Sequence, residues 1–206
     1  MGVVKYNAGV EDHRVLERWE NMKPKLEPTL RNDAKGLIRD LIAAAGGCLK
    51  GSVRLYKTFY IAHLMYWRYG PGVLTAYPIV HMPEGPGIDQ GPALLKELAD
   101  EGKIRVDIEF DGPYPEYTYR LQTKPRSFDR SDPRDRSVIE AVQWAGAHSA
   151  AQLSEITHEH SRSWKLTKSG EELDIYLDVL TDEEYQNIKS TTAEMKQLVG
   201  EVFGER

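Results

Sequence analysis

Apolar residues in the first half of the chain recur at helical spacing. Over residues 29–45 they fall three or four positions apart and form one apolar face, which predicts an amphipathic helix ended by Gly46 and Gly47. A second helix is expected over residues 52–69, and it is apolar on nearly every side, as central helices are. A third helix is expected over residues 91–101, before a glycine.

Strand patterns surround and follow the third helix. The segment KIRVDIEF at residues 103–110 alternates charged and apolar residues, and the alternation resumes over 117–121 after a glycine-proline turn. This predicts an antiparallel β-hairpin with one packed face and one solvent-exposed face. Residues 73–82 predict a short strand, and the prolines and glycines of residues 83–87 predict a rigid loop. Three helices followed by a hairpin give the outline of a winged helix.

The second half of the chain begins with a polar boundary over residues 122–136, which two prolines interrupt. A fourth helix is expected over residues 133–147. A fifth helix is expected to start at a capping box in which Ser149 pairs with Gln152. Residues 161–169 are expected to form a polar loop.

A last helix is expected to start at a second capping box, formed by Thr181 and Glu184. Its apolar residues share one helical stripe, which we expect to face inward. The helix is also acidic, and two interpretations remain open for that charge: a solvated face, or a surface that covers a basic partner. The residues of the apolar stripe are Tyr185, Ile188, Met195, Val199 and Val202.

Together these elements predict a mostly α-helical α+β fold, with a helical core, one antiparallel β-hairpin and C-terminal helices that close over it. The length of 206 residues and the hydrophobic content of 40% are typical of one globular domain. Residues 1–28 are interpreted as an N-terminal leader with a short helix near residues 15–22. Residues 29–122 form the helical core with the hairpin, and residues 123–206 form the C-terminal helical part of the same domain.

Composition and charge exclude several classes of protein. The net charge of -5 is not that of a basic protein that coats nucleic acid. Cys48 is the single cysteine, so the chain has no internal disulfide and no cysteine-cluster zinc site. No apolar run approaches the length of about 18 residues that spans a membrane. Residues 1–14 lack the apolar stretch of a secretory signal, so we expect a cytoplasmic protein without a membrane partner.

The residues that most often carry chemistry form no recognisable catalytic or cofactor motif. His158 and His160 stand two apart, and on a helix their rings point about 200° away from each other. Nucleophile-elbow, phosphate-loop and dinucleotide-binding patterns are absent from the sequence. We therefore expect no metal, no cofactor and no catalytic residue. A hydrolase that uses His63 or His81 remains a less favoured alternative.

Basic and aromatic residues are interleaved in the window of residues 50–70, which contains no acid. This combination suits nucleic acid, through phosphate contacts and base stacking, but it equally suits a core of aromatics with a rim of cations. Cations on the exposed face of the hairpin could extend a basic patch, although Asp107 and Glu109 share that face and weaken it.

Two parts of the chain resemble a known family. In the first part the run LYKTFYIAHLMYW is followed by YPIVHMPEGPGID, and the second part is LSEITHEHSRSWK. The order and spacing of these runs are similar to those of the Panacea domain of the SocA-like antitoxin family. One departure lies after the second helix, where the usual G-x-x-I-T-G reads Gly70…Leu74-Thr75-Ala76. The residues that carry the match are Lys57, Phe59, Tyr60, Ala62, His63, Gly85, Pro86, Leu94, Leu95, Leu153, Ser154, Thr157, His158 and Trp164.

The resemblance implies a non-enzymatic antitoxin that neutralises a cognate toxin by direct binding, in a system associated with phages. A protease or chaperone is implied as a further partner, because the family prototype delivers its toxin to a protease. Aromatic residues of the second helix are candidate anchors for such contacts. The expected partner-binding residues are Tyr56, Lys57, Tyr60, His63, Trp67, Tyr69, Pro86 and Trp164.

The main alternative is a winged-helix DNA-binding regulator. It would use residues 91–101 as its recognition helix and residues 103–121 as its wing. That helix carries Lys96 as its one cation against three acids, which is a poor match to the phosphate backbone. DNA is therefore the less favoured partner.

Overall fold

The computed structural model describes residues 28–110 and 115–203, with the side chains of residues 198–203 left out. The expected leader helix near residues 15–22 lies outside these ranges. Seven α-helices and a small amount of antiparallel sheet make up the described chain, so the predicted mostly α-helical α+β class is confirmed. The elements in chain order are α2 (Pro28–Ala44), β1 (Cys48–Lys50), α3 (Ser52–Tyr66), β2 (Ile79–Met82), β3 (Gly85–Ile88), α4 (Gly91–Asp100), β4 (Ile104–Glu109), β5 (Glu116–Leu121), α5 (Pro133–Gly146), α6 (Ala150–His160), α7 (Arg162–Leu166), the 3-10 helix η1 (Ile175–Asp178) and α8 (Asp182–Phe203).

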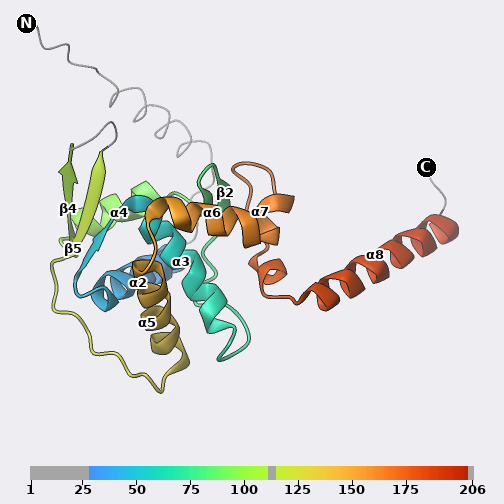
Figure 1. The fold of residues 1–206 in the computed structure, drawn as a ribbon, viewed down its shortest axis with the longest axis horizontal. Coiled ribbons are helices and arrows are strands. Elements are labelled where there is room, and N and C mark those ends of the chain that lie inside the picture. The colour runs from blue at the N-terminus through green and yellow to red at the C-terminus, as the bar shows by residue number, and fades with distance from the viewer. Residues whose placement is uncertain (1–27, 111–114, 204–206) are drawn as a thin grey trace, which may run out of the picture.

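Helix α3 lies at the centre of the fold, as its apolar residues on all sides predicted (Figure 1). It contacts α2, α5, α6 and β3. Leu55, Phe59 and Ala62 are completely buried on it. A helix surrounded in this way can bury almost any side chain, including polar ones, provided that each polar group finds a partner.

The predicted hairpin is present as β4 and β5, and β1 extends it to a three-stranded sheet in the order β1-β5-β4. Tyr119 of β5 pairs with Leu49 on one side and with Val106 on the other. The sequence did not indicate β1, because it is three residues long. It follows α2 through Gly46 and Gly47, whose φ values of 79° and 85° suit glycine.

A second sheet corrects the prediction for residues 83–87. Instead of a loop, Gly85–Ile88 forms strand β3, which pairs antiparallel with β2. Glycine and proline are depleted in strands, so sequence pattern argued against one here. Close packing explains the exception: a Cβ atom on Gly85 would lie 2.5 Å from the Lys57 Nζ and 2.6 Å from the Thr157 Oγ1.

The order α2, β1, α3, α4, β4, β5, with β1 paired to β5, corresponds to the winged-helix outline expected from the sequence. The β2–β3 hairpin is inserted between α3 and α4. Helices α5 and α6 then pack against α3. The C-terminal part of the chain as far as α6 therefore shares its core with the N-terminal part.

Capping side chains define the helices of the second half. Asp132 caps α5, and the predicted capping box of Ser149 and Gln152 starts α6. The expected polar loop over residues 161–169 is partly wrong, because Arg162–Leu166 forms the short helix α7. The Ser161 hydroxyl accepts a hydrogen bond from the Trp164 backbone N–H and begins that helix.

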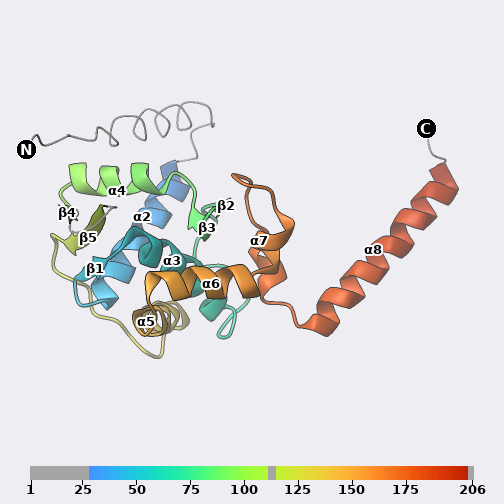
Figure 2. The ribbon, with the colours of Figure 1, turned by 45° about the horizontal axis from the view of Figure 1, so that its top comes forward.

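Helix α8 begins at the predicted capping box, in which the Thr181 backbone N–H donates to the Glu184 carboxylate and the Glu184 N–H donates to the Thr181 hydroxyl. The expectation that its apolar stripe faces inward is wrong for Ile188 and Met195, while the side chains of Val199 and Val202 lie outside those described. Both ribbon views show α8 extending away from the other helices (Figures 1 and 2). Ile188 is 49% exposed and Met195 is 62% exposed. In the described ranges, no helix is both long enough and apolar enough to cross a lipid bilayer.

Candidate protein-interaction groove

Of the eight residues expected to bind a partner, one is substantially exposed. Trp67 is 40% exposed, whereas Tyr56, Tyr69 and Trp164 are half-buried. The other four have almost no surface to offer a partner in this conformation, because neighbouring helices and the β2–β3 hairpin cover α3. These four are Lys57, Tyr60, His63 and Pro86.

The half-buried tyrosines make internal contacts. The Tyr56 ring lies against the Gly91 backbone, and burial raises the pKa of its hydroxyl well above the usual value. The Tyr69 hydroxyl donates a hydrogen bond to Glu140, and the Arg136 guanidinium stacks over its ring at 4.3 Å. Both rings therefore already have partners within the chain.

The segments on which the family resemblance rests meet at one place in the interior. The Lys57 ammonium donates a 3.0 Å hydrogen bond to the Pro86 carbonyl, close to Thr157. The Trp164 ring stacks between His81 at 4.5 Å and His158 at 4.2 Å. Its indole N–H donates to the Met82 carbonyl at 3.0 Å. This cluster joins α3, the β2–β3 hairpin, α6 and α7, so it fixes the relative positions of four elements.

A groove of about 520 Å³ opens beside this cluster, between residues 73–79 and residues 172–176. The two segments are paired further along the chain, where Val80 bridges to Glu172 and the Leu173 N–H donates to the Ile79 carbonyl at 2.7 Å. They separate beyond that point, and His63 forms part of the floor between them. We call this feature the His63 groove.

His63 is a structural residue of the floor. Its Nδ1–H donates to the Phe59 carbonyl at 2.8 Å, and its Nε2 accepts the Thr75 backbone N–H at 3.3 Å. Burial lowers its pKa to about 4, which keeps the imidazole neutral at physiological pH. Because both nitrogens already bind backbone groups, this histidine is poorly placed to act as the base of a hydrolase.

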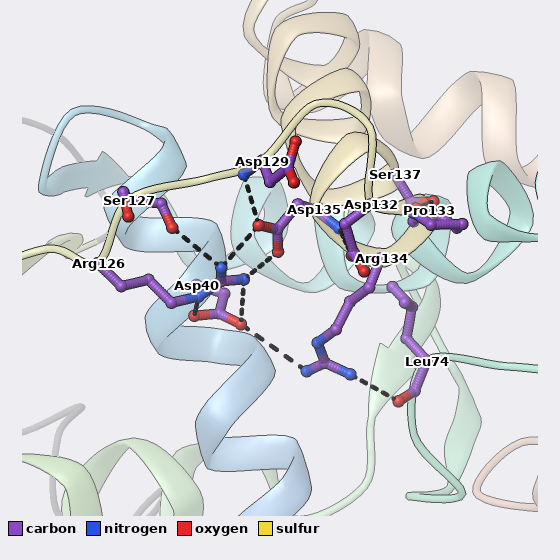
Figure 3. A network of polar contacts seen from close by, with 10 residues as sticks. All are labelled: Asp40, Leu74, Arg126, Ser127, Asp129, Asp132, Pro133, Arg134, Asp135 and Ser137. Atoms are coloured by element: carbon purple, nitrogen blue, oxygen red, sulfur yellow. Dashed lines mark hydrogen bonds and ion pairs between the residues drawn. The ribbon is translucent and has the colours of Figure 1, made fainter.

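One wall of the groove is held by the polar network of Figure 3. Arg134 of α5 donates to the Leu74 carbonyl at 3.1 Å and also lies 3.8 Å from Asp40 of α2. Arg126 bridges Asp40 and Asp135, with nitrogen–oxygen distances of 2.8–3.1 Å to Asp40. The Asp40 and Asp135 carboxylates at its centre are both paired with guanidinium groups, so the network fixes this wall.

The other wall is held by Asp178 at the end of η1. Its carboxylate accepts hydrogen bonds from the Tyr60 hydroxyl at 2.8 Å, the Ser161 hydroxyl at 3.0 Å and the Ser163 backbone N–H at 2.8 Å. These donors come from α3 and the start of α7, and Ser161 and Ser163 are buried. Such bonds to a carboxylate are stronger than neutral ones, so they fix the position of η1.

The rim of the groove is aromatic and acidic. Trp67 and Tyr176, which are 40% and 45% exposed, meet edge to face with ring centroids 5.7 Å apart. Glu172 and Asp174 lie on the same rim as Tyr176 and are exposed. Neither carboxylate forms an ion pair with another side chain of the described ranges. An aromatic pair beside unneutralised acids is a surface that suits a cationic protein partner.

The structure gives no indication of a metal centre in its described part: nowhere in residues 28–110 and 115–203 do three His, Cys, Asp or Glu side chains converge. No family model, curated protein or solved structure matches the chain. The resemblance to the Panacea domain therefore remains a prediction from the sequence.

Sequence reasoning named His63 of the floor and Trp67 of the rim, and missed the rest of the groove. Its walls come from irregular segments about a hundred positions apart, which carry no periodic pattern. Tyr176 had no signal beyond being an aromatic residue in the short segment DIYLD, which matches neither a helical nor a strand period over any length. The groove exists because the chain returns after α7 to pair with β2.

Proposed function

We propose that this protein is an antitoxin-like inhibitor that binds a partner protein through the His63 groove and its Trp67–Tyr176 rim. The observation that carries the proposal is the exposed aromatic pair at the edge of a groove whose two walls are fixed from behind. Aromatic side chains beside a preformed cavity are typical anchors of protein–protein binding.

The rigidity of the walls favours tight binding. The Arg134 and Asp178 contacts hold both segments before any partner arrives, so little ordering entropy is lost on association. The Glu172 and Asp174 carboxylates favour a partner segment that carries Arg or Lys. A toxin with a basic working surface fits this description, and covering that surface would block it.

The family resemblance supports the same function. Motif residues of α3, β3, α6 and α7 meet in one cluster, at Lys57, Pro86, Thr157, His158 and Trp164. Such convergence is expected when separate short motifs maintain a single architecture. In that interpretation the motif residues stabilise the binding scaffold, and the rim residues Trp67 and Tyr176 contact the toxin.

The proposal is tested by neutralisation. The chain is co-expressed with the product of each reading frame that adjoins its own gene, and for a toxic product survival is compared between wild type and a Trp67→Ala/Tyr176→Ala variant. The double variant is expected to lose protection and to lose binding in calorimetry. Phe110→Ala is the control, since Phe110 is 77% exposed at the end of β4. Protection by the folded double variant would contradict the proposal.

The amount of toxin in the cell distinguishes direct inhibition from delivery of the toxin to a protease. If the antitoxin acts as an adaptor, the toxin disappears during co-expression and returns in cells that lack the responsible protease. If it acts as a blocking inhibitor, the toxin accumulates as an inactive complex. The groove geometry favours blocking, because the rim and its acidic residues form a single contact surface.

DNA binding is a second candidate, favoured by the winged-helix order of the elements. The electrostatics of the structure weigh against it. Arg105 and Arg120 of the hairpin both pair with Asp107, and Lys50 pairs with Glu116 at 2.9 Å. These cations are partly neutralised before any phosphate arrives. Tight duplex binding that falls steeply with salt concentration would establish this alternative instead.

A further inference from the structure

The exposed helix α8 carries an apolar seam with a seven-residue repeat. Ile188, Thr192 and Met195 follow one another at intervals of four and three residues, which is the spacing of coiled-coil core positions. The sequence continues this spacing with valines at positions 199 and 202. Ile188 is 49% exposed and Met195 is 62% exposed, so the seam is uncovered. We propose that α8 pairs with α8 of a second copy of this chain in a parallel coiled coil.

A helix of this kind needs a partner. Most helical stability in proteins comes from packing an apolar face, and isolated helices of about 15 residues or fewer are marginal in water. The 22 residues of α8 are fixed to the body at their root, where the Arg162 guanidinium pairs with Asp182 and lies 5.1 Å from the Tyr185 ring centroid. Between Ile188 and Met195 the seam is available to another helix.

The polar member of the seam is compatible with burial. The Thr192 hydroxyl donates to the Ile188 carbonyl at 2.8 Å within its own helix. Its hydrogen bond is therefore satisfied locally, and its methyl group remains for packing. Thr192 would weaken a coiled coil relative to an aliphatic residue, but it leaves no donor unpaired at the interface.

The charges beside the seam favour a second copy of α8 as the partner and a parallel orientation of the two helices. In a parallel pair of α8 helices, Glu184 of one copy lies opposite Lys189 of the other, twice by symmetry. In an antiparallel pair, Lys189 lies opposite Lys196, also twice, and these like charges repel. Both contacts of Glu184 with Thr181 involve Oε2, so the capping box does not occupy the Oε1 atom. The helix is thus complementary to a parallel copy of itself.

Sedimentation equilibrium of the full chain tests the pairing, over about three orders of magnitude in concentration. Wild type is expected to show a monomer–dimer equilibrium. Ile188→Asp/Met195→Asp is expected to remain monomeric over the same range, while Asn187→Asp/Ser190→Asp on the opposite face keeps the wild-type equilibrium. An unchanged melting temperature checks that the body is folded. A monomeric wild type, or a dimer that survives the seam substitutions, overturns the proposal.

A charge reversal tests the direction. Lys189→Glu places two like-charged pairs across a parallel dimer, so its Kd is expected to rise roughly tenfold. An antiparallel dimer would instead lose its Lys–Lys repulsion and become tighter, which overturns the parallel arrangement. Asn187→Glu/Ser190→Glu makes the same change in net charge on the outer face and is expected to leave the Kd close to that of wild type.

Discussion

The buried lysine of α3 gives the sharpest prediction about stability. Lys57 is 2% exposed, and among the described residues its ammonium donates a hydrogen bond to the Pro86 carbonyl alone. Burial lowers its pKa from 10.5 to about 7, against a smaller opposing effect of Glu84. We predict that Lys57→Met removes a rise in the free energy of unfolding that wild type shows above pH 7.

The sign follows from proton binding. Between pH 7 and the ordinary lysine pKa, the unfolded chain holds a proton on Lys57 that the folded chain has released. Stability therefore increases with pH in this window, by about 1.4 kcal/mol per pH unit from this group. Below pH 7 both states are protonated, the contribution is constant, and the folded state bears the full cost of the buried charge.

The interval from pH 7 to pH 9 lies inside this window and is accessible to unfolding experiments. Over it wild type is expected to gain about 2 kcal/mol relative to Lys57→Met, since Lys57 is already half-deprotonated in the folded chain at pH 7. At pH 7 the two proteins differ less, because losing the ammonium relieves the burial of a charge but leaves the Pro86 carbonyl unpaired, at a cost of about 1–3 kcal/mol. Burial raises the pKa of Tyr119 to about 12, so this buried phenol does not titrate in the interval.

Urea unfolding followed by tryptophan fluorescence at pH 7, 8 and 9 measures the difference. Lys96→Met is the matched control, because the Asp100 carboxylate raises the pKa of the exposed Lys96 and leaves it protonated throughout. Parallel stability curves for wild type and Lys57→Met would refute the reasoning. They would mean that the Lys57 ammonium stays charged in the folded protein.

Two further stability predictions rest on packing and on the groove wall. Gly91→Ala is expected to lower the free energy of unfolding by about 1–3 kcal/mol, because the added Cβ would lie 2.7 Å from the Tyr56 hydroxyl oxygen. Gly36→Ala has open space around it in α2 and is expected to raise the free energy of unfolding by about 0.5–1 kcal/mol. Urea unfolding measures both changes. Asp178→Ala is expected to lower the free energy of unfolding by about 3 kcal/mol, because it leaves buried hydrogen-bond donors unpaired. It is also expected to weaken partner binding, because η1 is no longer held in place. Glu172→Ala, an exposed neighbour, is its control for stability alone, and equal melting temperatures for the two would contradict the role given to Asp178.

Local pattern in the sequence was sufficient for most of the helices and for the main hairpin. The helices over residues 29–45 and 133–147 were recognised because one face of each is apolar at helical spacing. The hairpin over residues 103–121 was recognised because alternation at a period of two has no helical interpretation. The capping box at Ser149 was recognised for the same reason, since its hydrogen bonds join residues three positions apart. In each case the deciding interaction is short in sequence.

Tertiary contacts decided the elements that the pattern missed. Gly85–Ile88 forms a strand by pairing with β2, and residue 85 is a glycine because Lys57 and Thr157, both distant in sequence, leave no room for a side chain there. The His63 groove exists because residues 171–173 return to pair with β2. Local propensity cannot report either contact, since each depends on where distant elements are packed.

At the candidate site, the sequence predicted the types of residue, and the tertiary structure decided which of them are exposed. The sequence alone established that α3 is rich in aromatic residues and that the last helix carries an apolar stripe. The tertiary structure determined which of these residues reach solvent: Tyr60 and His63 are enclosed, while Trp67, Ile188 and Met195 are exposed. Periodicity identifies the face of a helix that avoids water, but what covers that face depends on the packing of the rest of the chain.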